Sequence, residues 1–162
     1  MMEEKEKAWK TVSSKYLFRR PWLTVRCEDM LLPNGNHIPE YYILEYPDWV
    51  NTIAITKEGK FVFVRQYRPG LGRTSYELCA GVCDKEDASP LVSAQRELWE
   101  ETGYGKGNWQ EYMVISANPS THTNLTHCFL ATDVEPIDHQ HLEDTEDLSV
   151  HLLTFEEVKQ LL

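Results

Sequence analysis

Residues 89–103 read SPLVSAQRELWEETG and carry the strongest helix signal in the chain. Ser89 is a good N-cap, Pro90 suits the first helical position, and Gly103 is a typical residue just past a helix C-terminus. We therefore predict a helix from Pro90 to Thr102. Small and apolar residues recur along it at helical spacing, which indicates one face packed against a core. The predicted core positions are Leu91, Ala94, Leu98 and Thr102.

Three carboxylates share another face of this helix. Glu97, Glu100 and Glu101 stand at i, i+3 and i+4, so their side chains are neighbours. Carboxylates this close repel one another unless a cation compensates them, and Mg²⁺ prefers oxygen ligands completed by water and substrate phosphates. Arg96 precedes Glu100 by one helical turn and can pair with it. The alternative is a solvated acidic face with an ordinary salt bridge.

Residues 81–104, GVCDKEDASPLVSAQRELWEETGY, resemble the box of the Nudix hydrolases, G-x5-E-x7-R-E-U-x-E-E-x-G-U, where U is bulky and apolar. The second half, from Arg96 to Tyr104, matches completely. The first half departs from the pattern, because Asp87 stands at the position of the first Glu and one extra residue separates it from Arg96. Asp87 or Glu86 fills the role of that Glu, or neither does.

The resemblance implies an α/β fold, the Nudix α/β/α sandwich with a mixed β-sheet. It also implies a hydrolase acting on acid anhydrides that cuts a diphosphate bond. The implied cofactor is Mg²⁺, with Mn²⁺ as an alternative, held by Glu97, Glu100, Glu101 and the backbone carbonyl of Ala80. Arg96 is then the residue that orients a carboxylate of the metal site.

Two further segments resemble the branch of ADP-ribose and ADP-sugar pyrophosphatases. Residues 66–68, QYR, and residues 77–81, ELCAG, are similar to its Q-Y-R and E-L-P-A-G segments, with Cys79 in place of Pro. Pro119 follows the box at about the distance where that branch has a Pro. The implied substrate is ADP-ribose or an ADP-sugar, cleaved to a nucleoside monophosphate and a sugar phosphate. The predicted substrate-binding residues are Arg65, Arg68 and Glu77, since the arginine fork suits phosphate oxygens.

The catalytic base has several candidates. Members of the family often carry a Glu shortly after that Pro, whereas residues 119–127, PSTHTNLTH, contain no carboxylate. We expect His122, which lies in a polar loop, to act as the base. The other candidates are His127, Glu143, Glu146 and a Glu of the helix itself.

Two other functions remain open. The first is a Nudix hydrolase of another diphosphate, such as a dinucleotide, a different nucleotide sugar or a coenzyme A derivative. The second is a non-catalytic Nudix module that senses a ligand. Such modules usually lack parts of the R-E-x-x-E-E stretch, which is complete here. A magnesium-dependent activity screen separates the two classes.

The length of 162 residues and the hydrophobic content of 41% suit one domain over residues 1–162. The 26 acidic residues exceed the 16 Lys and Arg, and the net charge of −10 disfavours a nucleic-acid partner. No stretch is apolar enough to span a membrane, so we expect no membrane partner. Residues 1–15 are charged and predict a loose lead-in without a signal core, which indicates a cytoplasmic protein with reduced cysteines.

Runs of β-branched and aromatic residues predict strands on both sides of the helix. The expected strands cover residues 22–27, 41–45, 50–56, 60–67, 76–80, 109–115, 126–132 and 147–153. Residues 154–157, TFEE, form a capping-box pattern that opens a terminal helix. The resembling pyrophosphatases commonly dimerise through N-terminal strands, which residues 16–50 supply here. We therefore predict a homodimer, with an apolar interface that includes Trp22, Tyr41, Tyr42 and Trp49.

Overall fold

The computed structural model describes residues 7–161, which divide into two compact units. The first unit contains the described chain up to Tyr46 together with residues 116–124. The second contains residues 47–115 and the chain from Leu125 onward. The expectation of one domain over residues 1–162 stays a prediction.

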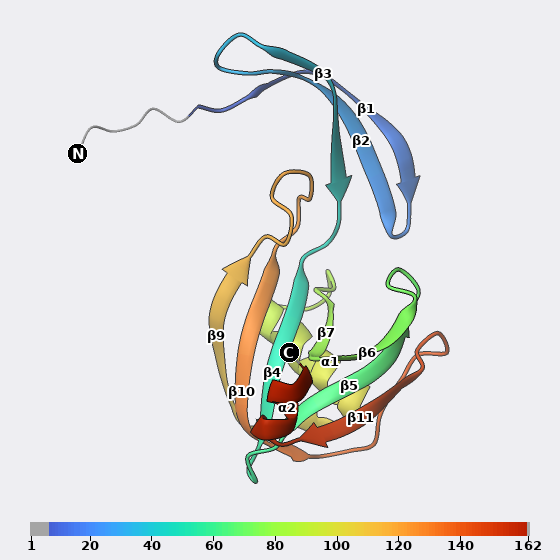
Figure 1. The fold of residues 1–162 in the computed structure, drawn as a ribbon, viewed down its shortest axis with the longest axis vertical. Coiled ribbons are helices and arrows are strands. Elements are labelled where there is room, and N and C mark those ends of the chain that lie inside the picture. The colour runs from blue at the N-terminus through green and yellow to red at the C-terminus, as the bar shows by residue number, and fades with distance from the viewer. Residues whose placement is uncertain (1–6, 162) are drawn as a thin grey trace, which may run out of the picture. The chain divides into compact units, whose positions relative to one another are not determined.

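The first unit is a three-stranded antiparallel sheet with the order β1-β2-β3 (Figure 1). Its strands are β1 (Lys10–Arg20), β2 (Leu23–Leu31) and β3 (His37–Glu45). The loose lead-in predicted for residues 1–15 is wrong from Lys10 onward, because the backbone there pairs with β2. Thr11 and Val12, whose types favour strands, lie in this stretch among its charged and polar residues. Residues 1–6 of the predicted lead-in lie outside the described residues.

The second unit is built on an eight-stranded mixed sheet (Figure 1). Its central path is β11-β5-β4-β10-β8, with β6 beside β5, β7 beside β4 and β9 beside β10. Strands β10 and β4 run parallel, and the other pairs are antiparallel. The bounds are β4 (Trp49–Thr56), β5 (Phe61–Arg68), β6 (Arg73–Glu77), β7 (Cys79–Val82), β8 (Tyr104–Gly105), β9 (Asn108–Ile115), β10 (Thr126–Pro136) and β11 (Leu148–Leu153).

Strands β4 and β5 diverge soon after they meet. They pair at Ala54↔Val62 and at the adjacent position, and beyond these β4 pairs with β7 while β5 pairs with β6. The single strand expected at residues 76–80 is therefore two strands separated by Leu78, because each half has a different neighbour. The divergence makes room for β7 directly beneath the central helix, which packs on β7 and β4.

The central helix, α1, runs from Pro90 to Thr102, as predicted. Ser89 caps its start, with the side chain accepting the Val92 N–H at 3.4 Å, and Gly103 ends it in the left-handed region at φ 72°. Ala94, Leu98 and Thr102 are buried as expected, whereas Leu91 is 36% exposed. Leu98 is fully buried in a cluster with Ala54, Val62, Cys79, Ala131 and Val134.

The terminal helix, α2 (Phe155–Leu161), begins with the predicted capping box. Thr154 N–H donates to Glu157 Oε2 at 2.7 Å, and Glu157 N–H donates to Thr154 Oγ1 at 3.2 Å. Figure 1 shows α1 behind the sheet and α2 in front of it. The mixed sheet between two helical layers confirms the expected α/β/α architecture. Neither helix of the described residues has the length and apolar character that a bilayer crossing requires.

Candidate active site

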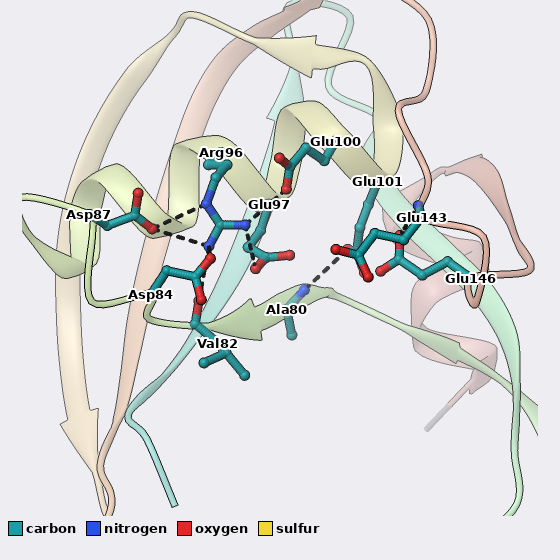
Figure 2. Close-up of polar contacts among 10 residues, drawn as sticks. All are labelled: Ala80, Val82, Asp84, Asp87, Arg96, Glu97, Glu100, Glu101, Glu143 and Glu146. Atoms are coloured by element: carbon teal, nitrogen blue, oxygen red, sulfur yellow. Dashed lines mark hydrogen bonds and ion pairs between the residues drawn. The ribbon is translucent and has the colours of Figure 1, made fainter. Parts of the chain in front are cut away.

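Two carboxylates of α1 lie against β7 (Figure 2). A Cβ atom on Gly81 would fall 2.1 Å from the carboxyl carbon of Glu97, so this carboxylate rests directly on the Gly81 backbone. Glu101 Oε2 accepts a hydrogen bond from Ala80 N–H at 3.3 Å. Ala80 and Gly81 thus hold two of the three carboxylates predicted to bind a metal.

Arg96 links the carboxylates of Glu97 and Glu100 to the segment that precedes the helix (Figure 2). Its guanidinium donates to Glu97 Oε1 at 2.9 Å and to Glu100 Oε2 at 2.8 Å. It also donates to Asp87 Oδ2 at 3.1 Å and to the Val82 carbonyl oxygen at 3.1 Å. Partial burial lowers the pKa of Arg96, but the bond to Glu100 and the charge of Glu97 outweigh it and raise that pKa. The predicted pairing of Arg96 with Glu100 is confirmed.

Asp87 fills the position where the box has its first Glu. Its side chain is 13% exposed and bound to Arg96, whereas Glu86 is exposed. Figure 2 shows Asp87 on the side of Arg96 away from Glu101. Asp87 therefore positions the arginine.

Burial makes Glu101 the unusual member of the cluster. Only 5% of this residue is exposed, and burial raises the pKa of its carboxyl to about 7. Burial likewise raises the pKa of Glu97. The burial of Glu101 could have been predicted from helical spacing. Glu101 follows the buried Ala94 by seven residues and the buried Leu98 by three, so all three lie on one face of the helix. Negative charge at this position is costly without a compensating cation.

The donor set fits a hard divalent cation. Glu97 and Glu101 lie against the Ala80–Gly81 backbone, and Glu100 is bound to Arg96 on the same helix. Carboxylate oxygens are donors that Mg²⁺ and Mn²⁺ prefer. Arg96 is shared among several carboxylates and leaves excess negative charge at the helix. A divalent ion would compensate that charge, with Glu97, Glu100, Glu101 and the Ala80 carbonyl as the residues to hold it.

The loop between β10 and β11 brings two further carboxylates to this cluster. Figure 2 shows Glu143 and Glu146 beside the Glu101 end of the helix. Glu146 Oε2 accepts the backbone N–H of Glu143 at 2.9 Å. After burial, the charge of Glu146 is among the causes that raise the pKa of Glu97 and of Glu101. Among the candidate bases outside the helix, these two therefore lie with the carboxylates predicted to bind the metal.

The two candidate histidines have other surroundings. His122 belongs to the first unit, where its ring centroid lies 5.5 Å from that of Tyr46. His127 lies on β10 with both ring nitrogens occupied. Its Nδ1 is 2.8 Å from Glu111 Oε1, and its Nε2 is 3.5 Å from Asp48 Oδ2. The His127 ring is thus held between two carboxylates.

The predicted substrate-binding residues lie on the β5–β6 hairpin. Arg68 donates to Glu77 through Nε at 3.0 Å and through Nη2 at 2.7 Å. The bond to Glu77 raises the pKa of Arg68, and the charge of Glu101 adds to this effect, so the pair lies near the carboxylate cluster. Arg65 is exposed, with its guanidinium 5.7 Å from the ring centroid of Tyr76.

Two family models match the chain on either side of residue 45. Residues 9–44 match the nucleoside diphosphate sugar hydrolase N-terminal domain, and residues 46–162 match the NUDIX domain. A solved structure described as an ADP compounds hydrolase resembles the chain with a TM-score of 0.83 at 21% identity. That likeness covers 98% of this chain and 85% of the other, and it concerns the fold.

Sequence relatives cover most of the chain. An ADP-ribose pyrophosphatase of Bacillus subtilis (strain 168) is 31% identical over 153 residues, which are 94% of this chain and 82% of that protein. A methanol dehydrogenase activator of Bacillus methanolicus is 31% identical over 152 residues, or 93% and 81% of the two chains. With the NUDIX model matched over residues 46–162, this protein belongs to the Nudix family, whose hydrolases generally use a divalent metal ion.

Proposed function

We propose that this protein is a Mg²⁺-dependent hydrolase that cleaves the diphosphate bond of a nucleoside diphosphate sugar, with ADP-ribose as the preferred substrate. The observation that carries the proposal is the packing of Glu97 and Glu101 on the Ala80–Gly81 backbone, with Arg96 fixing Glu97 and Glu100. This arrangement supplies preorganised oxygen ligands next to an arginine-rich hairpin. Mn²⁺ is the alternative ion for the same ligands.

Each group of residues has a separate task in this proposal. Glu97, Glu100, Glu101 and the Ala80 carbonyl hold the ion, and Arg96 keeps two of these carboxylates in place. A bound divalent cation supplies charge neutralisation at the diphosphate and makes a water molecule more acidic. Arg68, with Glu77 as its partner, and Arg65 bind the substrate, since guanidinium groups suit phosphate oxygens.

The choice of substrate rests on the relatives and on the motifs of the β5–β7 region. Proteins named ADP-ribose pyrophosphatase match from Bacillus subtilis and, at 28% identity over 132 residues, from Mycobacterium tuberculosis. A second candidate is GDP-mannose, because a GDP-mannose pyrophosphatase of Escherichia coli (strain K12) is 30% identical over 118 residues, which are 66% of this chain and 59% of that protein. The two substrates release different nucleoside monophosphates, so product identity separates them.

We assign the general base to Glu146 in place of His122. Glu146 lies on the loop that faces Glu101, and its charge acts on both Glu97 and Glu101, whereas the described contact of the His122 ring is with Tyr46. A carboxylate at the edge of the cluster can accept the proton of the attacking water. The cytoplasmic location and the lack of nucleic-acid and membrane partners stay predictions.

The homodimer is also part of the proposal. All eleven residues of β1 are exposed, including Val12, Tyr16, Leu17 and Phe18. Trp22 is 69% exposed and Tyr42 is 44% exposed, whereas Tyr41 packs edge-on against Trp9. Apolar side chains in this number on a three-stranded sheet favour burial against a second copy.

Replacing Glu101 by Gln tests the reaction itself. With Mg²⁺ present, we expect the unaltered protein to release AMP and a sugar phosphate from ADP-ribose, measured by product chromatography. The variant should lose about 100-fold or more in kcat, since even outer partners of a metal site cost 10–100-fold. Its unfolding midpoint should change little, because Gln has nearly the same volume. Glu86→Gln, in the exposed loop of the same box, is the control and should keep the rate. An unaltered rate in Glu101→Gln would sink the assignment of the site.

Adding a methyl group at Gly81 tests the contact between the Glu97 carboxylate and the backbone of β7. In Gly81→Ala the new Cβ would overlap the Glu97 carboxylate, so the carboxylate must move away from β7. We expect a loss of about 100-fold in kcat/KM, since a displacement near 1 Å can cost that much. Gly70→Ala is the matched control, because nothing lies within 4 Å of a Cβ at that turn position. Equal activity of the two variants would contradict the proposed geometry.

Three single variants separate the candidate bases in steady-state kinetics. Glu146→Gln should lower kcat by about 10²–10⁴-fold with a smaller change in KM, as removal of a general base does. His122→Gln should leave kcat unchanged. Glu143→Gln should have the smaller effect of the two loop carboxylates, because Glu143 contacts the Glu146 carboxylate through its backbone N–H. A larger loss in Glu143→Gln or in His122→Gln would move the role away from Glu146.

Light scattering at micromolar concentration tests the dimer. We expect twice the chain mass of 18.9 kDa, and a mass near 18.9 kDa would rule the dimer out. Phe18→Glu places a charge on the exposed face of β1 and should shift the protein to the monomer. Leu71→Glu, at a β5–β6 turn position that is 63% exposed, should remain dimeric.

A further inference from the structure

A second group of metal-ligating side chains follows β10. Asp138, His139 and His141 each offer one ligand atom, and these atoms all lie within 4.8 Å of one another. In the described part of the chain, no other group of His, Cys, Asp and Glu side chains meets this condition. None of these three residues belongs to the box or to the substrate hairpin.

The distances suit a transition-metal ion. Asp138 Oδ1 is 2.7 Å from His139 Nδ1, and Asp138 Oδ2 is 3.0 Å from His141 Nε2. In a tetrahedral zinc site with bonds of about 2.0–2.1 Å, the ligand atoms are about 3.3 Å apart. Small side-chain rotations therefore bring the three atoms around one ion and leave a fourth position for water.

The backbone that carries these ligands is already fixed. It closes the C-terminal end of α1, where helices leave carbonyl groups without partners. His141 N–H donates to the Glu100 carbonyl at 2.8 Å, and the Gln140 side chain donates to the Glu101 carbonyl at 2.7 Å. The His141 ring stacks on Trp99 with a centroid distance of 4.2 Å. The backbone of the candidate ligands is therefore already ordered before a metal ion binds.

Gly103 contributes to the same rigidity. Its φ of 72° turns the chain at the end of α1, and a Cβ there would fall 2.3 Å from the Asp138 carbonyl oxygen. The Gly103 carbonyl accepts the N–H groups of Ile137 at 2.9 Å and Asp138 at 3.2 Å. The ligand turn thus lies at the C-terminus of a 13-residue helix, where the helix dipole favours a cation.

We propose that Asp138, His139 and His141 form a second metal site that binds Zn²⁺, or a similar transition-metal ion, independently of the carboxylate site on α1. Two imidazoles and one carboxylate select such ions over Mg²⁺, which prefers oxygen ligands. The exposure of His139 leaves the site open to solvent. If the proposed function holds, the bound ion also immobilises the start of the loop that carries Glu143 and Glu146.

Calorimetric titration of the full chain with Zn²⁺ tests the site. The protein is prepared without a histidine tag and is saturated with Mg²⁺, so that the carboxylates of α1 are occupied. We expect one equivalent of Zn²⁺ to bind, and we expect it to be lost in His139→Ala. His139 has a side chain that is 79% exposed, so folding is not at risk. The double variant His139→Ala/His141→Ala should give the same loss.

His37→Ala is the matched control. His37 Nε2 pairs with Asp29 Oδ1 at 2.7 Å, a single histidine–carboxylate contact like those of the proposed site. This variant should keep the full equivalent of Zn²⁺. Zinc-edge X-ray absorption of the complex should show two imidazole ligands. Unchanged Zn²⁺ binding in His139→Ala, no binding in the unaltered chain, or a ligand shell without imidazole would overturn the proposal. None of these readouts depends on hydrolysis, so the proposed function can fail without affecting them.

Discussion

The contact between helix α1 and the backbone of β7 is the constraint on which the rest of the second unit depends. Glu97 can lie against β7 because residue 81 is glycine, and β7 can lie beneath the helix because β4 and β5 diverge. Leu98, fully buried one position after Glu97, anchors the same helix in the core. The burial of Leu98 therefore fixes the position of α1 and with it the position of the carboxylates on β7. The carboxylates are held there even though their own burial is unfavourable.

That arrangement places charges where they are unfavourable in isolation. Glu101 is almost fully buried, and its pKa rises to about 7 because burial disfavours the ionised form. Arg96 relieves part of the repulsion at Glu97 and Glu100, but it is also bound to Asp87. Core packing therefore keeps the carboxylates together despite their mutual repulsion, and the site is preorganised for a divalent ion.

Much of this could be predicted from the sequence where the signals are local. The bounds of α1 follow from Ser89, Pro90 and Gly103, and the capping box of α2 follows from residues 154–157, because caps are decided by neighbours in the chain. The box residues from Arg96 onward lie on one helix, so their mutual spacing needs no tertiary information. The strand pattern likewise gave a mixed sheet flanked by helices.

The predictions of secondary structure that were wrong concern segments whose conformation depends on residues far away in the sequence. Strand β1 is exposed along its whole length and forms because β2 is there to pair with it, so no pattern of burial marked residues 10–15 as a strand. The break at Leu78 has the same origin, since β6 and β7 pair with different strands. The choice of His122 as the base is not one of these errors and stays a prediction, which rests on the polarity of a loop that belongs to the first unit.

The end of α1 shows how one segment can serve both stability and chemistry. The turn at residues 137–141 satisfies carbonyls of Glu100, Glu101 and Gly103 and then continues into the loop of Glu143 and Glu146. The backbone carbonyl groups of Glu100 and Glu101 are thus held by the turn. Their carboxylates are held by Arg96 and by the Ala80 N–H of β7, respectively. A shift of the turn would act on the backbone that carries the side chains proposed to bind the metal. We infer that the position of the loop carboxylates relative to Glu101 is fixed through the helix backbone, which explains how residues far apart in the sequence keep one geometry.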